Sequence, residues 1–188
     1  MEVGAVVRSR VAASREPMRR AGAGRWLGAI IAIAWTLIVA HGASAQEQEA
    51  SSIERGRYLV RIGGCNDCHT AGYPQSGGNV PESQWLTGNA VGFQGPWGVS
   101  YPANLRLRLQ EMNEEQWMAA ARAPRLPPMP WFNLRDMSDA DLRSIYAYVR
   151  ALGPAGKPIP MSVPPGSPVA TQVIVFVPQD LADSTSSR

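Results

Sequence analysis

Apolar residues recur at helical spacing in three short stretches of the chain, residues 53–63, 113–122 and 138–152. In the last of these, Ser138 stands at the position of an N-cap and Gly153 follows the final apolar residue. An apolar stripe with a period near 3.6 residues between two such signals is typical of an amphipathic helix. The pattern therefore predicts short helices in the central part of the chain.

The segment between the first two predicted helices is rich in glycine and proline. Residues 71–104 contain eleven of these residues in 34 positions, which predicts a long loop without regular structure. A loop of that length in a compact domain needs a surface to pack against. The residues after 154 are also rich in proline, and the stretch VIVFV (173–177) has the composition of a short strand or extended segment.

The first 45 residues have the composition of a leader. Arg19, Arg20 and Arg25 precede the uncharged run at 26–40, and the small residues ASA follow at 43–45. This order is typical of a secretory signal peptide with its cleavage site. An uncleaved membrane anchor is the alternative, because the uncharged stretch continues for 21 residues and is just long enough to span a bilayer. Both interpretations predict export of the rest of the chain to the periplasm.

The formal charge of +3 comes from the leader. It holds six arginines and two glutamates, which leaves twelve basic and thirteen acidic residues in the remainder, a net charge of −1. The remainder shows no basic stripe, which disfavours a nucleic-acid partner. The predicted organisation is a signal peptide or anchor at 1–45, a linker at 46–52, one domain at 53–153 and a Pro-rich C-terminal extension at 154–188.

The residues suited to chemistry are concentrated in CNDCH, residues 65–69. Cys65 and Cys68 are the two cysteines of the sequence, and His69 follows directly. A structural zinc site requires four ligands, and no second ligand pair follows the leader. A thioredoxin-like redox motif would need a βαβ context, which the surrounding pattern lacks. C-x-x-C-H is the signature of covalent haem attachment, so the motif predicts one haem c, bound through two thioethers with His69 as an axial ligand of its iron.

The second axial ligand must be another residue type, because the sequence has no further histidine after the leader. A methionine thioether is the usual soft alternative. Met129 stands out among the methionines because it lies in RLPPMPW, residues 125–131, where prolines stiffen the chain outside any predicted helix. We expect Met129 to be the sixth ligand. An open site is the alternative, as is one of the other methionines after the leader, Met112, Met118, Met137 and Met161.

The order of these features resembles the class I c-type cytochrome family over residues 52–153. The segments ERGRYLV, CNDCHT, PPMPW and MSDADLRSIYAYVRAL are similar to the monohaem domains that accompany bacterial periplasmic dehydrogenases. The resemblance implies a small all-α fold of three to five short helices around a covalently bound haem, with long Gly/Pro-rich loops.

The resemblance also implies two contacts within that fold. Gly56 would allow the first helix to approach Tyr146 or Tyr148 closely, at the point where the first and last helices cross. A loop proline, Pro81 or Pro96, would offer the carbonyl that accepts a hydrogen bond from the ring of the proximal histidine. Such a partner orients the ring of an iron ligand.

The function expected from these features is one-electron transfer, with no catalysis by the chain itself. A periplasmic dehydrogenase or respiratory complex would donate electrons, and an oxidase or another cytochrome would accept them. One alternative is an electron-transfer subunit of a larger dehydrogenase complex, with VIVFV and the Pro-rich extension as a docking element. A less favoured alternative is a peroxidase-like haem enzyme with a displaceable sixth ligand. The leader would add an association with the membrane if it is not cleaved.

A group of arginines in the second half of the domain has two interpretations. They could dock an acidic partner, or they could lie near the propionates of the haem. The residues concerned are Arg106, Arg108, Arg122 and Arg125.

Overall fold

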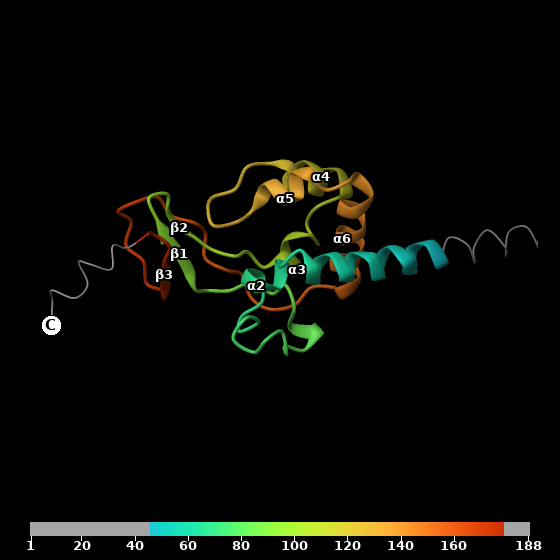
Figure 1. The fold of residues 1–188 in the computed structure, drawn as a ribbon, viewed down its shortest axis with the longest axis horizontal. Coiled ribbons are helices and arrows are strands. Elements are labelled where there is room, and N and C mark those ends of the chain that lie inside the picture. Colours follow the sequence, from blue (N-terminus) through green and yellow to red (C-terminus); the bar gives the residue numbers. More distant parts are fainter. Residues whose placement is uncertain (1–45, 179–188) are drawn as a thin grey trace, which may run out of the picture. The chain divides into compact units, whose positions relative to one another are not determined.

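The computed structural model describes residues 46–178 of the chain. The predicted signal peptide or anchor, residues 1–45, lies outside the described residues, as do residues 179–188. The described part divides into helices that surround one apolar core and a small sheet beside them (Figure 1). Within it, no helix has the length and apolar character needed to cross a membrane.

The elements occur in the following order along the chain. The first helix covers residues 46–62. The elements after it are α2 (Cys65–His69), the 3-10 helix η1 (Glu82–Gln84), β1 (Gly92–Gly95), β2 (Gly98–Ser100), α3 (Leu105–Arg108), α4 (Glu114–Arg122), α5 (Trp131–Asp136), α6 (Asp139–Leu152) and β3 (Val173–Val175).

The predicted helices are present, and hydrogen bonds cap their ends. The side chain of Ser138 accepts a hydrogen bond from the amide of Asp141 at the start of α6, and Gly153 caps the other end. Asn113 and Gln116 form a reciprocal capping box at the start of α4. The first helix extends beyond the prediction, because residues 46–52, assigned to a linker, are helical. Glutamine, glutamate and alanine in that stretch are good helix formers.

The all-α prediction is wrong in one respect, because the structure contains a three-stranded sheet. The strand order is β2-β1-β3, with β1 antiparallel to β2 and parallel to β3. β1 and β2 arise within the segment predicted to lack regular structure, and β3 lies in the predicted VIVFV segment. The strands have three or four residues each, too short for a recognisable alternation of polar and apolar positions.

The core forms where the first helix crosses α6 (Figure 1). At the crossing, a Cβ added to Gly56 would lie 1.9 Å from the carbonyl oxygen of Ser144 and 2.7 Å from the Cβ of Tyr148. The close approach to Tyr148 that the family resemblance implies is therefore confirmed. The hydroxyl of Tyr146 instead donates to the carbonyl of Met112 at 2.8 Å.

A polar cluster fastens η1 to this crossing. The guanidinium of Arg57 contacts both carboxylate oxygens of Glu82 at 3.0 Å, and the hydroxyl of Tyr148 donates to the same carboxylate at 2.8 Å. The hydrogen bonds from Arg57 and Tyr148 hold the pKa of Glu82 below its ordinary value, although partial burial opposes them. Glu82 therefore links the loop after the CxxCH motif to both crossing helices.

Replacing Gly56 with alanine should destabilise the protein. Alanine would normally favour a helix over glycine by about 1 kcal/mol. Here the added methyl group overlaps backbone atoms, and overpacking typically costs about 1–3 kcal/mol or more. We expect a net loss on the order of 1–2 kcal/mol in denaturant unfolding. Glu54→Ala, at an exposed position of the same helix, is the control; equal stability of the two variants would contradict a tight crossing.

Replacing Glu82 with glutamine should lower stability in a pH-dependent way. The folded-state pKa of Glu82 lies below the unfolded value, so its contribution is full above the unfolded pKa and is lost as the pH falls through the folded pKa. Because its side chain is 36% exposed, we expect a loss of only about 1 kcal/mol at neutral pH. In chemical unfolding, the difference from wild type should shrink as the pH falls below about 4.3, the ordinary pKa of glutamate, and vanish below the folded-state pKa of Glu82. Glu111→Gln, at an exposed position, should show no such convergence.

Candidate functional site

The CxxCH motif lies on a single helical turn. The first helix ends at residue 62, and Gly64 adopts a left-handed conformation (φ 68°) immediately before α2. Only glycine takes this conformation readily, so Gly64 allows the chain to turn here. Residues three apart on a helix share a face. α2 therefore presents Cys65 and Cys68 on the same side, with His69 at its last position.

A hydrogen bond to a backbone carbonyl orients the imidazole of His69. Its Nδ1 lies 2.7 Å from the carbonyl oxygen of Ala103, and the residue is only 9% exposed. A carbonyl accepts, so Nδ1 carries the proton and Nε2 is the nitrogen left to bind a metal. The expectation that Pro81 or Pro96 supplies this carbonyl is wrong.

Burial governs the acid–base properties of the motif. It lowers the pKa of His69, which the Ala103 hydrogen bond opposes in part, and so favours the neutral imidazole that metals bind. It also raises the pKa of the Cys65 thiol to about 11, and that of Cys68 moves in the same direction. Both cysteines are free thiols here. A thiolate nucleophile would require the opposite shift, so the surroundings disfavour reactive-thiol chemistry.

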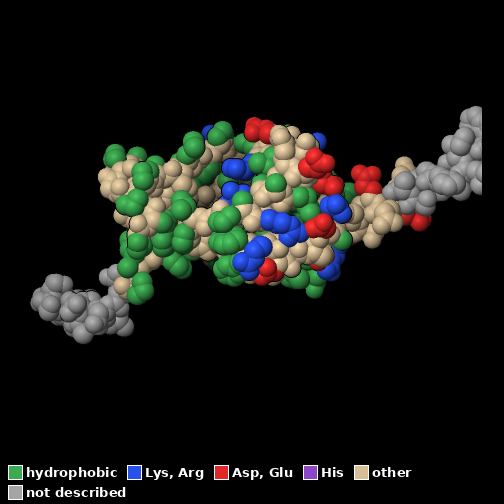
Figure 2. Space-filling view, turned by 90° about the horizontal axis from the view of Figure 1, so that it is seen from above, with side chains coloured by type: hydrophobic (Ala, Val, Ile, Leu, Met, Phe, Trp, Pro, Cys, Tyr) green, Lys and Arg blue, Asp and Glu red, His purple; other side chains and the backbone are tan. Residues whose placement is uncertain are grey.

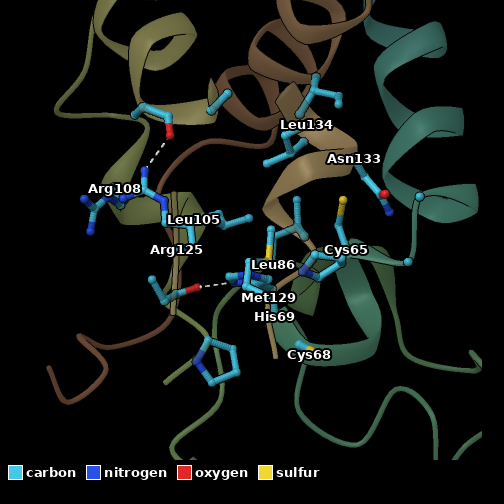
Figure 3. A pocket seen from close by; sticks show the side chains of 18 of the residues that line it. Cys65, Cys68, His69, Leu86, Leu105, Arg108, Arg125, Met129, Asn133 and Leu134 are labelled. Carbon is cyan, nitrogen blue, oxygen red and sulfur yellow. Dashed lines mark hydrogen bonds between the residues drawn. The ribbon is translucent and has the colours of Figure 1, made fainter. Parts of the chain in front are cut away.

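The motif borders a cavity of about 410 Å³. This volume is within the range of small-molecule and cofactor sites. Figure 3 shows His69 and Met129 in this cavity, contributed by two different segments of the chain, with Leu86, Leu105 and Leu134 around them. This cavity is lined by all four residues that were predicted to hold one cofactor, namely Cys65, Cys68, His69 and Met129.

The structure also places the other methionines. Met112 and Met137 line the same cavity as Met129. Met118 packs against the core, and Met161 is 86% exposed in the C-terminal extension. Three methionines, Met112, Met129 and Met137, therefore line the cavity, and Met129 as the sixth ligand stays a prediction.

The loop that carries Met129 has few backbone donors of its own, because three of its residues are prolines. The amide of Met129 donates to Leu126 at 3.3 Å, and the amide of Trp131 donates to Met129 at 2.8 Å. The hydroxyl of Ser100 in β2 donates to the carbonyl of Pro127 at 2.5 Å. A side chain 27 residues away thus contacts the methionine loop, which nothing in the sequence indicated.

Two arginines face the cavity without an acidic partner among the described residues. Arg108 and Arg125 both line it, and Arg125 donates to the carbonyl of Ala120 at 2.6 Å. Burial lowers the pKa of Arg125, and the charge of Arg108 lowers it further. Figure 2 shows basic side chains beside a hollow in a largely hydrophobic part of the surface. Like charges facing one apolar cavity favour a ligand that carries negative charge.

The two remaining arginines of the group have structural partners. Arg106 is buried, and its guanidinium donates to the carbonyls of Leu152 and Gly153 at the end of α6. Arg122 forms an ion pair with Asp139. These contacts cap a helix and join two helices, which leaves Arg108 and Arg125 as the pair directed at the cavity.

No group of three or more His, Cys, Asp or Glu side chains within residues 46–178 is arranged to hold a bare metal ion. An iron already held by the nitrogens of a porphyrin needs only one or two side chains from the protein. The residues of the cavity fit that second kind of site.

Comparisons with known proteins give distant relatives. The chain is 28% identical over 123 residues to one of the subunits of the nicotinate dehydrogenase of Pseudomonas putida, a match that covers 59% of this chain and 9% of that protein. It is 29% identical over 126 residues to the cytochrome c subunit of the quinone-dependent alcohol dehydrogenase of Gluconobacter oxydans, covering 60% of this chain and 24% of that protein. The matched part is thus a quarter or less of either relative. No family profile and no solved structure matches.

These relatives are subunits of dehydrogenases, and one of them is a cytochrome c subunit. The helix-rich domain seen here is compatible with a cytochrome-like domain in such a complex. Haem attachment, the individual ligands and export are not tested by these comparisons and stay predictions.

Proposed function

We propose that this chain is a c-type cytochrome that transfers single electrons as a subunit or partner of a periplasmic dehydrogenase. The observation that carries the proposal is the convergence of Cys65, Cys68, His69 and Met129 on one apolar cavity. Two sequence motifs that lie 60 residues apart line a single space of the right size for a cofactor. The dehydrogenase relatives support the partner class.

The residues of the cavity suit haem c in three respects. Cys65 and Cys68 would form thioethers with its two vinyl groups, and their shared helical face supports attachment to one ring. His69 would bind the iron through Nε2, since Nδ1 is engaged by Ala103. Met129 would be the second axial ligand. The bound haem would supply a one-electron couple between ferrous and ferric iron.

The charges of the cavity fit the same group. Haem carries two carboxylates, and Arg108 and Arg125 are two cations that face the cavity without an acidic partner among the described residues. Pairing with carboxylates would relieve the repulsion between them. The mostly apolar lining would limit the access of water to the ring. The arginines therefore have a role in holding the cofactor that does not require an acidic protein partner.

The proposal extends to the pathway and the location. The leader would direct the domain to the periplasm, either free or tethered to the membrane by an uncleaved anchor. A dehydrogenase or respiratory complex would be the electron donor, and an oxidase or another cytochrome the acceptor.

Expression in a host that matures c-type cytochromes should give a coloured protein. The peptide that spans Cys65 and Cys68 should carry the added mass of haem in mass spectrometry of the denatured protein. Cys65→Ala combined with Cys68→Ala should abolish covalent attachment, because the sequence has no other cysteine. Each single variant should keep one thioether and show a shifted spectrum in the reduced form. A colourless wild-type protein with unmodified cysteines would refute the proposal.

Replacing Met129 with leucine should convert the six-coordinate low-spin spectrum to a high-spin one and lower the reduction potential, because a methionine ligand raises it. Leucine preserves volume, so Met112→Leu and Met137→Leu are matched controls in the same cavity. Carbon monoxide affinity of the reduced protein should rise about 100-fold for Met129→Leu if the ligand is detached about 1% of the time in wild type.

The same three variants separate the alternatives. A loss of the low-spin spectrum in Met112→Leu or Met137→Leu would identify that methionine as the sixth ligand in place of Met129. If none of the variants changes the spectrum and wild type binds carbon monoxide rapidly, the site is open, as a peroxidase-like enzyme requires.

A further inference from the structure

The C-terminal extension is built into the cofactor site. The hairpin of β1 and β2 lies between two of its segments. Val163 exchanges two backbone hydrogen bonds of 2.9 Å with Val99 at the outer edge of β2. On the other side, β3 pairs with β1. The extension thus occupies both outer edges of the hairpin.

Further contacts hold the extension along the loop that precedes α3. The side chain of Asn104 donates to the carbonyls of Ala155 and Lys157 at 2.8 and 3.1 Å. The hydroxyls of Tyr101 and Thr171 lie 2.7 Å apart. Ser162 of the extension lines the cavity itself.

The segment so held, β2 and the loop after it, makes one contact with each of the two chain regions that carry the proposed iron ligands. The carbonyl of Ala103 accepts from the ring of His69, and the hydroxyl of Ser100 donates to Pro127, two residues before Met129. Ser100 is 8% exposed and directly follows Val99, the residue that pairs with the extension. Ser100 is buried whereas Pro127 is exposed, so the hydrogen bond between them contributes a modest net stabilisation that favours one position of the methionine loop.

We propose that Ser100 is a positioning residue for Met129, and that the C-terminal extension acts on the iron through it by fixing β2. The inference rests on the proposed function, since it takes Met129 as a ligand. It gives the extension a role inside the domain, in addition to any role in docking a partner.

The first test compares carbon monoxide affinity of the reduced, haem-loaded full chain. Ser100→Ala should raise the affinity about fivefold, because loss of one hydrogen bond increases the population with Met129 detached. Ser76→Ala is the matched control: its hydroxyl also donates to a backbone carbonyl, that of Tyr73 at 3.0 Å, away from the methionine loop. Ser100→Thr, which keeps a hydroxyl, should restore the wild-type affinity.

The second test asks whether the extension acts through Ser100. Val163→Pro removes the amide that donates to Val99 and should also raise the affinity for carbon monoxide. If both changes act on the same position of the methionine loop, the double variant should raise the carbon monoxide affinity by less than the product of the two single increases. A full product of the effects would overturn the role assigned to the extension.

Met129→Leu separates failure of this inference from failure of the proposed function. If Met129→Leu raises the affinity while Ser100→Ala behaves like Ser76→Ala, Ser100 does not position the ligand and the proposed function stands. If Met129→Leu has no effect, the proposed ligation is wrong and the inference fails with it.

Discussion

The hydrogen bond between the imidazole of His69 and the carbonyl of Ala103 is the interaction on which the arrangement of the site depends. It joins the end of α2 to a loop 34 residues later and fixes which ring nitrogen is free. The amide of Gly88 donates to the carbonyl of His69 at 2.7 Å, so backbone and side chain of the same residue are held by one loop. This double attachment ties both ends of the segment 70–103 to the end of α2, and two residues of that segment, Trp85 and Leu86, are buried in the core.

The cavity is large relative to the core that surrounds it. The core consists of eleven buried apolar residues within the described part of the chain, and a void of about 410 Å³ adjoins them. Apolar walls facing a void lose contacts that a filled interior would provide. Arg108 and Arg125 line the cavity, are exposed to solvent and have no acidic partner within residues 46–178, so their like charges repel each other. A mostly apolar ring with two carboxylates would compensate both, which ties the stability of the domain to its proposed cofactor.

The relatives suggest a setting in which the domain could work. Both are dehydrogenase subunits much longer than the segment matched here. For the proposed electron-transfer role, the domain has to keep its proposed iron ligands in place. Anchoring the methionine loop to a sheet, and the sheet to the C-terminal extension, provides such rigidity without a larger core.

The sequence by itself determined the local features of this protein. The caps at Ser138 and Asn113, the turn at Gly64 and the helical face shared by the two cysteines follow from residue types within a few positions of one another. These interactions are short in range, so neighbouring residues suffice to specify them. The approach of Gly56 to Tyr148 was also expected, although from a family resemblance and not from the spacing of residues.

Only the tertiary structure decided which groups act on the proposed ligands. The acceptor for His69 is a backbone carbonyl, and every residue has one, so the side chain of Ala103 gave no signal. The hydroxyl of Ser100 meets Pro127 because β2 is held in place by Val163, more than sixty residues away. Strands of three or four residues carry too little pattern to predict their pairing. Their partners are chosen by the packing of the whole chain, which brings distant backbone groups within hydrogen-bond distance.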